Sequence, residues 1–352
     1  MQKEIAIIPG DKLKQIVINI FTSLNVKHVD AAITADALVN ANFCGVDSHG
    51  IDLLPTYVER IKHGGINKRA NIKIVFENNG QMIIDADGAL GPVVAHYATN
   101  QSTKLAKEHG VSWVTVKNSN HIGMLGHYTR IMCDVNLIGI VLTNSGPNVA
   151  AWGGAEAVMG NNALSVGVPG SGFPSFLLDM ATGEVACGKI RLCANSGQEV
   201  PEGWILDSNG KPTTNPQDFI NEGVVLPFGK HKGFGIGMMV DLLTGVISGG
   251  LFGKDVRRQR QNHTLIAGSS QTFIAYDFDK YMNKEEFNQR IDSWINMVKT
   301  SKKAFGFDEI IIPGENERNI YIQRMNEGIP ITEEQMAYFD KFVDMKGVLN
   351  YE

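Results

Sequence analysis

Two histidines set in polar turns are the residues of this chain best suited to move a proton. His121 lies in the turn NSNHIG, and His49 lies in the turn VDSHG. Near a helix N-terminus the charged form of an imidazole is disfavoured, which brings its pKa into a useful range for proton exchange. The sequence therefore predicts general acid/base chemistry at His121, with a histidine bonded to nearby backbone as the alternative.

A glycine-rich stretch supplies a second candidate, for binding an anion. PFGKHKGFG, residues 227–235, leads into an apolar segment that we expect to be a buried helix. Glycines let the backbone approach a ligand, and amides at a helix start attract a pyrophosphate, to which Lys232 would add a charge. Close helix packing with solvated lysines is the alternative. Asp179 would either accept a hydrogen bond from a ribose hydroxyl or cap a helix. Tyr57 would either donate a hydrogen bond to a substrate oxygen or pack in the hydrophobic core.

Strands and a helix must position His121. VSWVTVK, residues 111–117, and LIGIVLT, residues 137–143, are β-branched runs bounded by turn residues, as is typical of buried strands. Met124 to Asp134 reads as a helix between them. In open α/β sheets the chemistry gathers at the carboxyl ends of strands, which is where His121 falls.

The rest of the chain divides into three predicted parts. Apolar residues recur at helical spacing before residue 64, strands alternate with helices from residue 72, and the chain ends in helices. Asn283 with Glu286, and Thr332 with Gln335, fit capping boxes. The predicted parts are a helical segment 1–71, an α/β domain 72–280, and a helical segment 281–352 that packs with the first.

Composition narrows the class of protein. The 352 residues are 43% hydrophobic and 20% charged, which excludes a disordered chain, and the net charge of −5 argues against a nucleic-acid partner. The four cysteines form no CxxC pair, so we expect reduced thiols and no metal site. No apolar run is long enough to span a membrane, and the start lacks a secretory signal. A cytoplasmic location is expected.

Several familiar motifs are missing. The chain has no G-x-G-x-x-G, no H-E-x-x-H and no G-x-S-x-G. GEVACGK, residues 183–189, begins like a phosphate loop, but Ile190 lacks the hydroxyl that would hold Mg²⁺. A dinucleotide bound without a Rossmann fingerprint remains, and the reaction type does not follow from these residues alone.

Taken together, the motifs resemble those of the malate/L-lactate dehydrogenase family that lacks a Rossmann fold, which also contains ureidoglycolate, sulfolactate and diketogulonate oxidoreductases. GVDSHG, NSNHIGMLGHY, TNSGPNVAAWGG, LDMAT followed by GKI, DSNGKPTTNP, PFGKHKGFG and IPGE occur in the family's order, nearly end to end. The resemblance implies an α/β fold. Its NAD(P)-binding domain would be of the non-Rossmann type, with a mixed sheet flanked by helices, and the N- and C-terminal segments would form a helical domain.

The resemblance also implies an activity: an NAD- or NADP-dependent oxidoreductase acting on a 2-hydroxy or 2-oxo acid, as a homodimer. His121 matches the proton-transferring residue and is grouped with His49 as catalytic, while Tyr57 and Ser48 match the substrate site. The matching cofactor positions are Ser145, Asn162, Asp179, Met180, Ala181, Lys232, Pro313, Gly314 and Glu315.

This chain departs from the family pattern at several positions. The family usually reads SHG-x-x-R, which would place an arginine at position 53, where this chain has Leu53. An arginine pairs with a carboxylate through two hydrogen bonds. Without one at position 53, the sequence does not identify the residue that binds the substrate carboxylate. Cys44 stands where the family usually has a basic residue, and Ala151 stands where it has a proline before WGG. Asn161 and Ala163 replace the threonine and the proline of the family's GTNP signature. Malate or lactate is the first substrate expected; the alternatives are ureidoglycolate, a sugar-derived keto acid, or a dinucleotide-binding protein without turnover.

Overall fold

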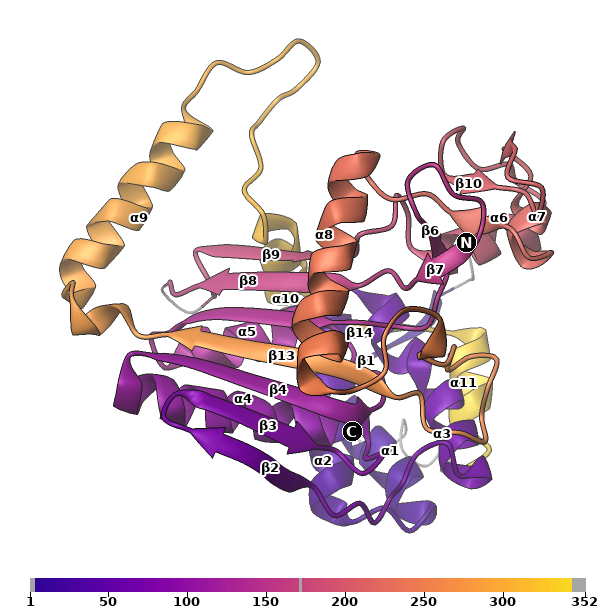
Figure 1. The fold of residues 1–352 in the computed structure, drawn as a ribbon, viewed down its shortest axis with the longest axis horizontal. Coiled ribbons are helices and arrows are strands. Elements are labelled where there is room, and N and C mark those ends of the chain that lie inside the picture. Colours follow the sequence, from indigo (N-terminus) through magenta and orange to yellow (C-terminus); the bar gives the residue numbers. More distant parts are fainter. Residues whose placement is uncertain (1–3, 171–172, 344–352) are drawn as a thin grey trace.

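A seven-stranded mixed sheet forms the centre of the computed structural model, which describes residues 4–170 and 173–343 (Figure 1). The strand order is β2-β3-β4-β13-β5-β8-β9, and only β3 and β4 run parallel as neighbours. The strands are β2 (Lys73–Asn78), β3 (Gln81–Asp85), β4 (Val111–Ser119), β5 (Ile138–Thr143), β8 (Ala163–Val168), β9 (Phe176–Met180) and β13 (Ser269–Tyr276). The expected α/β class with a mixed sheet is confirmed.

Helices cover both faces of this sheet. Helices α4 (Gly91–His109) and α5 (Leu125–Asp134) pack on one face, and α8 (His231–Asp241) with the π-helical turn η3 (Leu242–Val246) lies on the other (Figure 1). Val114, Val116 and Phe273 from the strands are fully buried with Tyr128 and Met132 of α5. This apolar layer fixes the strand ends that carry the polar turns.

The predicted strand, helix, strand unit around His121 is present, but its two strands are not neighbours. β13, from late in the chain, lies between β4 and β5 and is antiparallel to both, with Phe273 opposite Val114 and Val141. Because β4 and β5 then run in the same direction, the turn after each strand reaches the same edge of the sheet.

The chain ends share a second core. Helices α1 (Gly10–Ser23), α2 (His28–Phe43) and α3 (Leu54–His63) pack with α10 (Glu315–Glu327) and α11 (Glu333–Phe339) through residues such as Phe21, Leu38 and Phe339. The terminal segments, which we expected to be helical, also contribute a two-stranded sheet, in which β1 (Glu4–Ile8) pairs antiparallel with β14 (Ile329–Thr332). The short 3-10 turns η1 (Asp47–His49) and η2 (Ile51–Leu53) join α2 to α3.

A smaller five-stranded sheet is formed by short strands from two segments, 149–159 and 205–225. Its order is β11-β10-β12-β6-β7, and α6 (Cys187–Ser196) and α7 (Pro216–Ile220) pack beside it. The strands are β6 (Val149–Ala150), β7 (Ala157–Met159), β10 (Ile205–Leu206), β11 (Pro212–Thr213) and β12 (Val224–Val225). The expected loop at 207–216 therefore contains a tight turn, a short strand and the first residue of α7.

Three glycines near Lys232, at positions 233, 235 and 237, lie inside a helix rather than in a preceding loop, which corrects one expectation. α8 begins at His231, and a Cβ on Gly233 or Gly237 would overlap Phe228 or crowd Met159. At these two positions the glycines permit close packing. The expected burial of α8 is also wrong in part, since Met238 is 55% exposed.

Helix starts behave as their sequences predict. Asn283 caps α9 (Lys284–Lys299) by accepting from the amide of Glu286, and Thr332 with Gln335 forms a complete capping box on α11. The second bond of a capping box, from the Asn283 amide to the Glu286 side chain, is not formed, so Asn283 is a simple N-cap. The 3-10 turns η4 (Gly253–Asp255) and η5 (Phe278–Lys280) complete the elements.

Candidate active site

His121 lies in the turn between β4 and α5, at an edge shared with the N-terminal helices. Asn120, directly before it, is buried and donates to the carbonyls of Gly88 and Ala89 at 2.8 and 2.9 Å. The amide of Gly123 donates to Nδ1 of His121 at 3.2 Å, and Gly123 has φ +80°, where a side chain would be strained. The ring is half-buried.

Tyr57 and His49 complete a cluster around that ring. The Tyr57 hydroxyl, on α3, lies 3.0 Å from Nδ1 of His121 and donates to the His121 carbonyl at 3.1 Å. The His49 ring lies with its centre 5.5 Å from that of His121, and Ser48 Oγ is 3.1 Å from Nδ1 of His49. The structure thus brings together His121, His49 and Tyr57, while the Ser48 side chain is exposed and contacts His49 rather than His121.

Burial keeps these groups uncharged. Desolvation, with the charge of Arg260, lowers the pKa of His49 to about 4. Desolvation, then the charges of His49, Arg260 and Arg60, lowers the pKa of His121 to about 3. Burial raises the pKa of Tyr57, so its hydroxyl keeps its proton. The protein therefore presents neutral imidazoles and a neutral phenol to a ligand.

Arg60, which sequence reasoning missed, holds this arrangement together. Its guanidinium is fully buried and meets no carboxylate of the described residues; Nη2 donates to Asn120 Oδ1 at 2.8 Å and to the Gly65 carbonyl at 2.8 Å. Burial lowers its pKa to about 10. The only available sequence signal was its place one turn after Tyr57 on the same helix.

Three of the predicted cofactor positions lie near one another, and a fourth lies on a helix that contacts them. The amide of Ser145 donates to Asn162 Oδ1 at 3.2 Å, and Asn162 Nδ2 donates to the Gly237 carbonyl of α8 at 2.9 Å. Thr182, directly after Ala181, donates its amide to the Asn161 carbonyl at 2.7 Å. Lys232 lies in the first turn of α8, with an exposed side chain.

The amides at the start of α8 do not form the anion cradle that was expected. Those of Lys232, Gly233 and Phe234 already donate to the carbonyls of residues 229, 228 and 230. In the described part of the chain, no hydrogen bond or ion pair occupies the Lys232 ammonium. An anion at this end of α8 would therefore be bound mainly by the charge of Lys232, because the backbone amides already have partners.

Asp179 lies in β9 and binds the start of α5 with one carboxylate oxygen, which leaves the other oxygen for a ligand. Its Oδ2 accepts from the amide of Gly126, in the first turn of α5, at 2.6 Å. Burial raises the pKa of Asp179 to about 7, against the lowering effect of that amide. Met180, the next residue, pairs with Leu164 in the sheet.

The segment 313–315 packs against the same strand. The Pro313 carbonyl accepts from the amide of Leu177 at 3.0 Å, and Gly314, at φ +95°, leaves no room for a Cβ beside Leu177. Glu315 is bound by Lys299 at 2.6 and 2.7 Å. Although burial opposes it, this lysine holds the pKa of Glu315 below its usual range, so the carboxylate is already engaged.

Several groups in this region have no partner in the part of the chain that the structure describes, and are available to bind a dinucleotide. The buried Oδ1 atom of Asn161 has no partner, nothing lies within 4 Å of a Cβ built on Gly229 or Gly235, and Lys232 has a free charge. These are an acceptor, two open backbone surfaces and a cation, which suit the amide and phosphate groups of a nicotinamide dinucleotide. Among the described residues no group of acidic, cysteine or histidine side chains could hold a metal ion, and all four cysteines are free.

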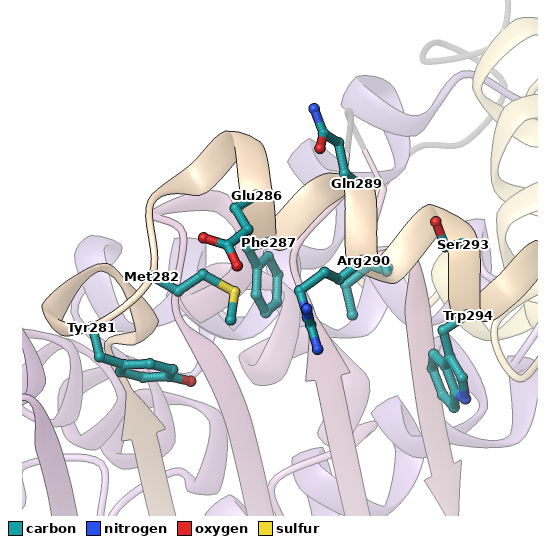
Figure 2. Close-up of a pocket in the computed structure, with 9 residues that line it drawn as sticks. Tyr281, Met282, Glu286, Phe287, Gln289, Arg290, Ser293 and Trp294 are labelled. Atoms are coloured by element: carbon teal, nitrogen blue, oxygen red, sulfur yellow. The ribbon is translucent and has the colours of Figure 1, made fainter.

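One hollow lies away from the predicted site residues. It has a volume of about 700 Å³ and lies beneath α9, lined by Tyr281, Phe287, Arg290 and Trp294 among others (Figure 2). None of the predicted site residues lines it. Figure 1 shows α9 and the segment after it standing away from the sheet, and the lining residues named above lie on α9 or just before it.

Comparisons with known proteins agree with this architecture. The family model described as malate/L-lactate dehydrogenase matches residues 8–340. A malate dehydrogenase of Pyrococcus abyssi is 36% identical, with 98% of this chain and 96% of the relative covered. An L-sulfolactate dehydrogenase of Methanocaldococcus jannaschii is 38% identical, with 89% and 90% covered.

The solved structure of the sulfolactate dehydrogenase from Methanocaldococcus jannaschii superposes with a TM-score of 0.89 at 35% identity, covering 98% of this chain and 99% of that one. Relatives also include an enzyme named ureidoglycolate dehydrogenase (NAD(+)). The chain therefore belongs to the malate/L-lactate dehydrogenase family, a family of oxidoreductases that act on small hydroxy acids with a nicotinamide cofactor.

Proposed function

We propose that the protein is an NAD(P)-dependent oxidoreductase that interconverts a 2-hydroxy acid and its 2-oxo acid, with malate (or lactate) as the first substrate to test. The observation that carries this proposal is the contact of His121 Nδ1 with both Tyr57 and Gly123. These contacts occupy Nδ1 and leave Nε2 as the nitrogen that can exchange a proton with a substrate.

The two neutral tautomers of His121 have separate partners. With the proton on Nε2, Nδ1 accepts from the Gly123 amide, and Nε2–H can donate to an oxo group. With the proton on Nδ1, the Tyr57 oxygen accepts it while the Tyr57 hydroxyl still donates to the His121 carbonyl. Nε2 is then free to take the proton of a hydroxy acid, as a general base must.

A bound NADH or NADPH would supply the hydride that reaches the 2-oxo carbon. The chain's own part is to hold the cofactor and to protonate the oxo oxygen from Nε2 of His121, with His49 beside it. The donor in reduction is the imidazolium form of His121, which returns to the neutral ring, and oxidation reverses this proton transfer. We propose that Ser145, Asn162, Ala181 and Lys232 form one part of that cofactor site, and that Asp179, Met180 and residues 313–315 form another.

Lys232→Ala is expected to weaken cofactor binding about tenfold, because one charge near a phosphate contributes on the order of 1.5 kcal/mol. The side chain is exposed, so the fold should be unaffected. Quenching of NADH fluorescence on titration gives the dissociation constant, with Lys230→Ala as the matched control. An unchanged constant in Lys232→Ala would refute the phosphate contact.

The pH profile of hydroxy-acid oxidation should be unusually flat on the acid side. Oxidation needs neutral His121, which exists above its pKa, and burial lowers that pKa from 6.5 to about 3. Oxidation kcat/KM at saturating cofactor should therefore hold from about pH 8 down to about pH 5. A loss of activity with an inflection near the ordinary histidine pKa would show that the ring is solvated.

A panel of acids tests the substrate class. Malate, lactate, sulfolactate, ureidoglycolate and sugar-derived 2-oxo acids should be assayed with NAD and with NADP by absorbance of the reduced cofactor. We expect turnover of at least one 2-hydroxy acid. Tight NADH binding without oxidation of any of them would favour the alternative of a dinucleotide-binding protein without turnover.

We further propose a homodimer in the cytoplasm. Apolar side chains are exposed on α8 and η3, on α9 and in the segment after it, and a partner copy would cover them; they are Met238, Leu242, Val246, Trp294, Met297, Phe305 and Phe307. Sedimentation should give twice the chain mass of 38.4 kDa. A monomer at micromolar concentration would contradict the dimer.

No helix among the described residues has the length and apolarity needed to cross a membrane.

A further inference from the structure

Arg60 places the chain around Arg260 next to the active-site turn. Its Nη1 donates to the carbonyls of Gln259, at 3.4 Å, and of Asn262, which lie on either side of Arg260 in the sequence. The same guanidinium binds Asn120, the residue before His121, at 2.8 Å. One buried side chain therefore fixes both the proton-exchanging turn and the backbone that carries Arg260.

Arg260 and Arg60 are the two arginines whose charges lower the pKa of His121. They differ in whether their hydrogen-bond donors are already occupied. Both terminal nitrogens of Arg60 are taken up by oxygens of the protein, including the Leu265 carbonyl at 3.1 Å. The Arg260 side chain is exposed, and within residues 4–170 and 173–343 no hydrogen bond or ion pair occupies it. Asp52, the acidic group that acts on it, is bound by Gln335 at 2.7 Å.

The surroundings of Arg260 suit an anion. Its charge lowers the pKa of both His49 and His121, beyond the larger effect of burial. A guanidinium beside two imidazoles, with Arg191 adding a further positive charge, is an unfavourable arrangement that a bound carboxylate would relieve. Position 53 cannot meet this need, because Leu53 is 2% exposed and packs in the N-terminal core.

We propose that Arg260 binds the carboxylate of the 2-hydroxy or 2-oxo acid and holds it against His121. This inference rests on the proposed function. The planar guanidinium offers two parallel N–H donors to a carboxylate, so it fixes orientation as well as charge. Arg260 thereby selects substrates by their acid group, and a neutral analogue of the same shape gains nothing from it.

Arg260→Gln tests the proposal with a 2-oxo acid that the wild type reduces and with the amide of that acid. The KM for the acid should rise at least about tenfold with a smaller change in kcat, because an ionic hydrogen-bond pair is lost. The preference for acid over amide should fall by a similar factor, while the dissociation constant of NADH stays unchanged. Arg260→Lys should keep part of the preference.

Arg257→Gln is the matched control. Arg257 is exposed on the same segment and donates to the Ile266 carbonyl at 2.9 Å. It should keep the wild-type KM and the wild-type preference for the acid. An unchanged preference in Arg260→Gln, with active wild type, would overturn the role of Arg260 alone; a wild type that reduces no 2-oxo acid would overturn the proposed function as well.

Discussion

Replacement of His121 with alanine is expected to cut turnover at least a hundredfold while leaving NADH binding near that of the wild type. A positioned general acid/base contributes on the order of 10² to 10⁴ in rate, and no other side chain in the described part of the chain contacts Tyr57 and Gly123 as His121 does. The ring does not support the fold, since it is half-buried and its bonds are all to groups of the site. Steady-state rates with the best acid of the panel measure the loss.

The matched control is His63→Ala, at the end of α3, where the side chain is 53% exposed and its acidic contact is Glu59. It should keep wild-type rates. Retained turnover in His121→Ala would remove the acid/base role. A loss of NADH affinity equal to the loss of rate would instead assign His121 to cofactor binding.

Gly91→Ala is expected to destabilise the protein and to disable the site together. A Cβ on Gly91, the first residue of α4, would overlap the carbonyl oxygen and carbonyl carbon of His121. Backbone cannot rotate away as a side chain can, so we expect a loss of about 3 kcal/mol in the free energy of unfolding. The displaced His121 should also lose most of its turnover, because acid/base catalysis depends on its position.

The control for this change is Gly188→Ala in α6, where nothing lies within 4 Å of the added Cβ. Alanine there should leave stability unchanged or raise it by up to about 1 kcal/mol, because it favours a helix over glycine. Denaturant unfolding of both variants makes the comparison. A Gly91→Ala variant as stable and active as the wild type would show that the turn can shift freely.

Local patterns predicted much of the fold. The β-branched runs at 111–117 and 137–143 became β4 and β5, because their alternation suits a buried sheet whatever lies beside them. Caps at Asn283 and Thr332 were equally readable, since each depends on three or four neighbouring residues. The three-part division stays a prediction.

Long-range pairing could not be predicted. β13 enters between β4 and β5 from more than a hundred residues away, and nothing in VSWVTVK or LIGIVLT specifies that neighbour. The pairing of β1 with β14 joins the two ends of the chain, and neither short strand is stable without that distant partner, so local patterns could not predict them. In α8, the glycines suited a ligand loop and helix packing equally, and only the positions of Phe228 and Met159 decide for packing.

The site was predicted in part. His121, His49 and Tyr57 came from turn context and from the family resemblance, and they do lie together. Arg60 and Arg260 were missed, because their roles arise from two segments about 200 residues apart that meet only in the fold. A buried arginine with no carboxylate has no local signature in a sequence.

A crystal structure of the protein with NADH and oxamate, an unreactive analogue of a 2-oxo acid, tests the central claim most directly. The account predicts Nε2 of His121 within hydrogen-bond distance of the analogue's oxo oxygen, with the nicotinamide ring on the other side of the oxo carbon. A nicotinamide bound away from His121, or an analogue whose oxo group faces another side chain, would contradict it.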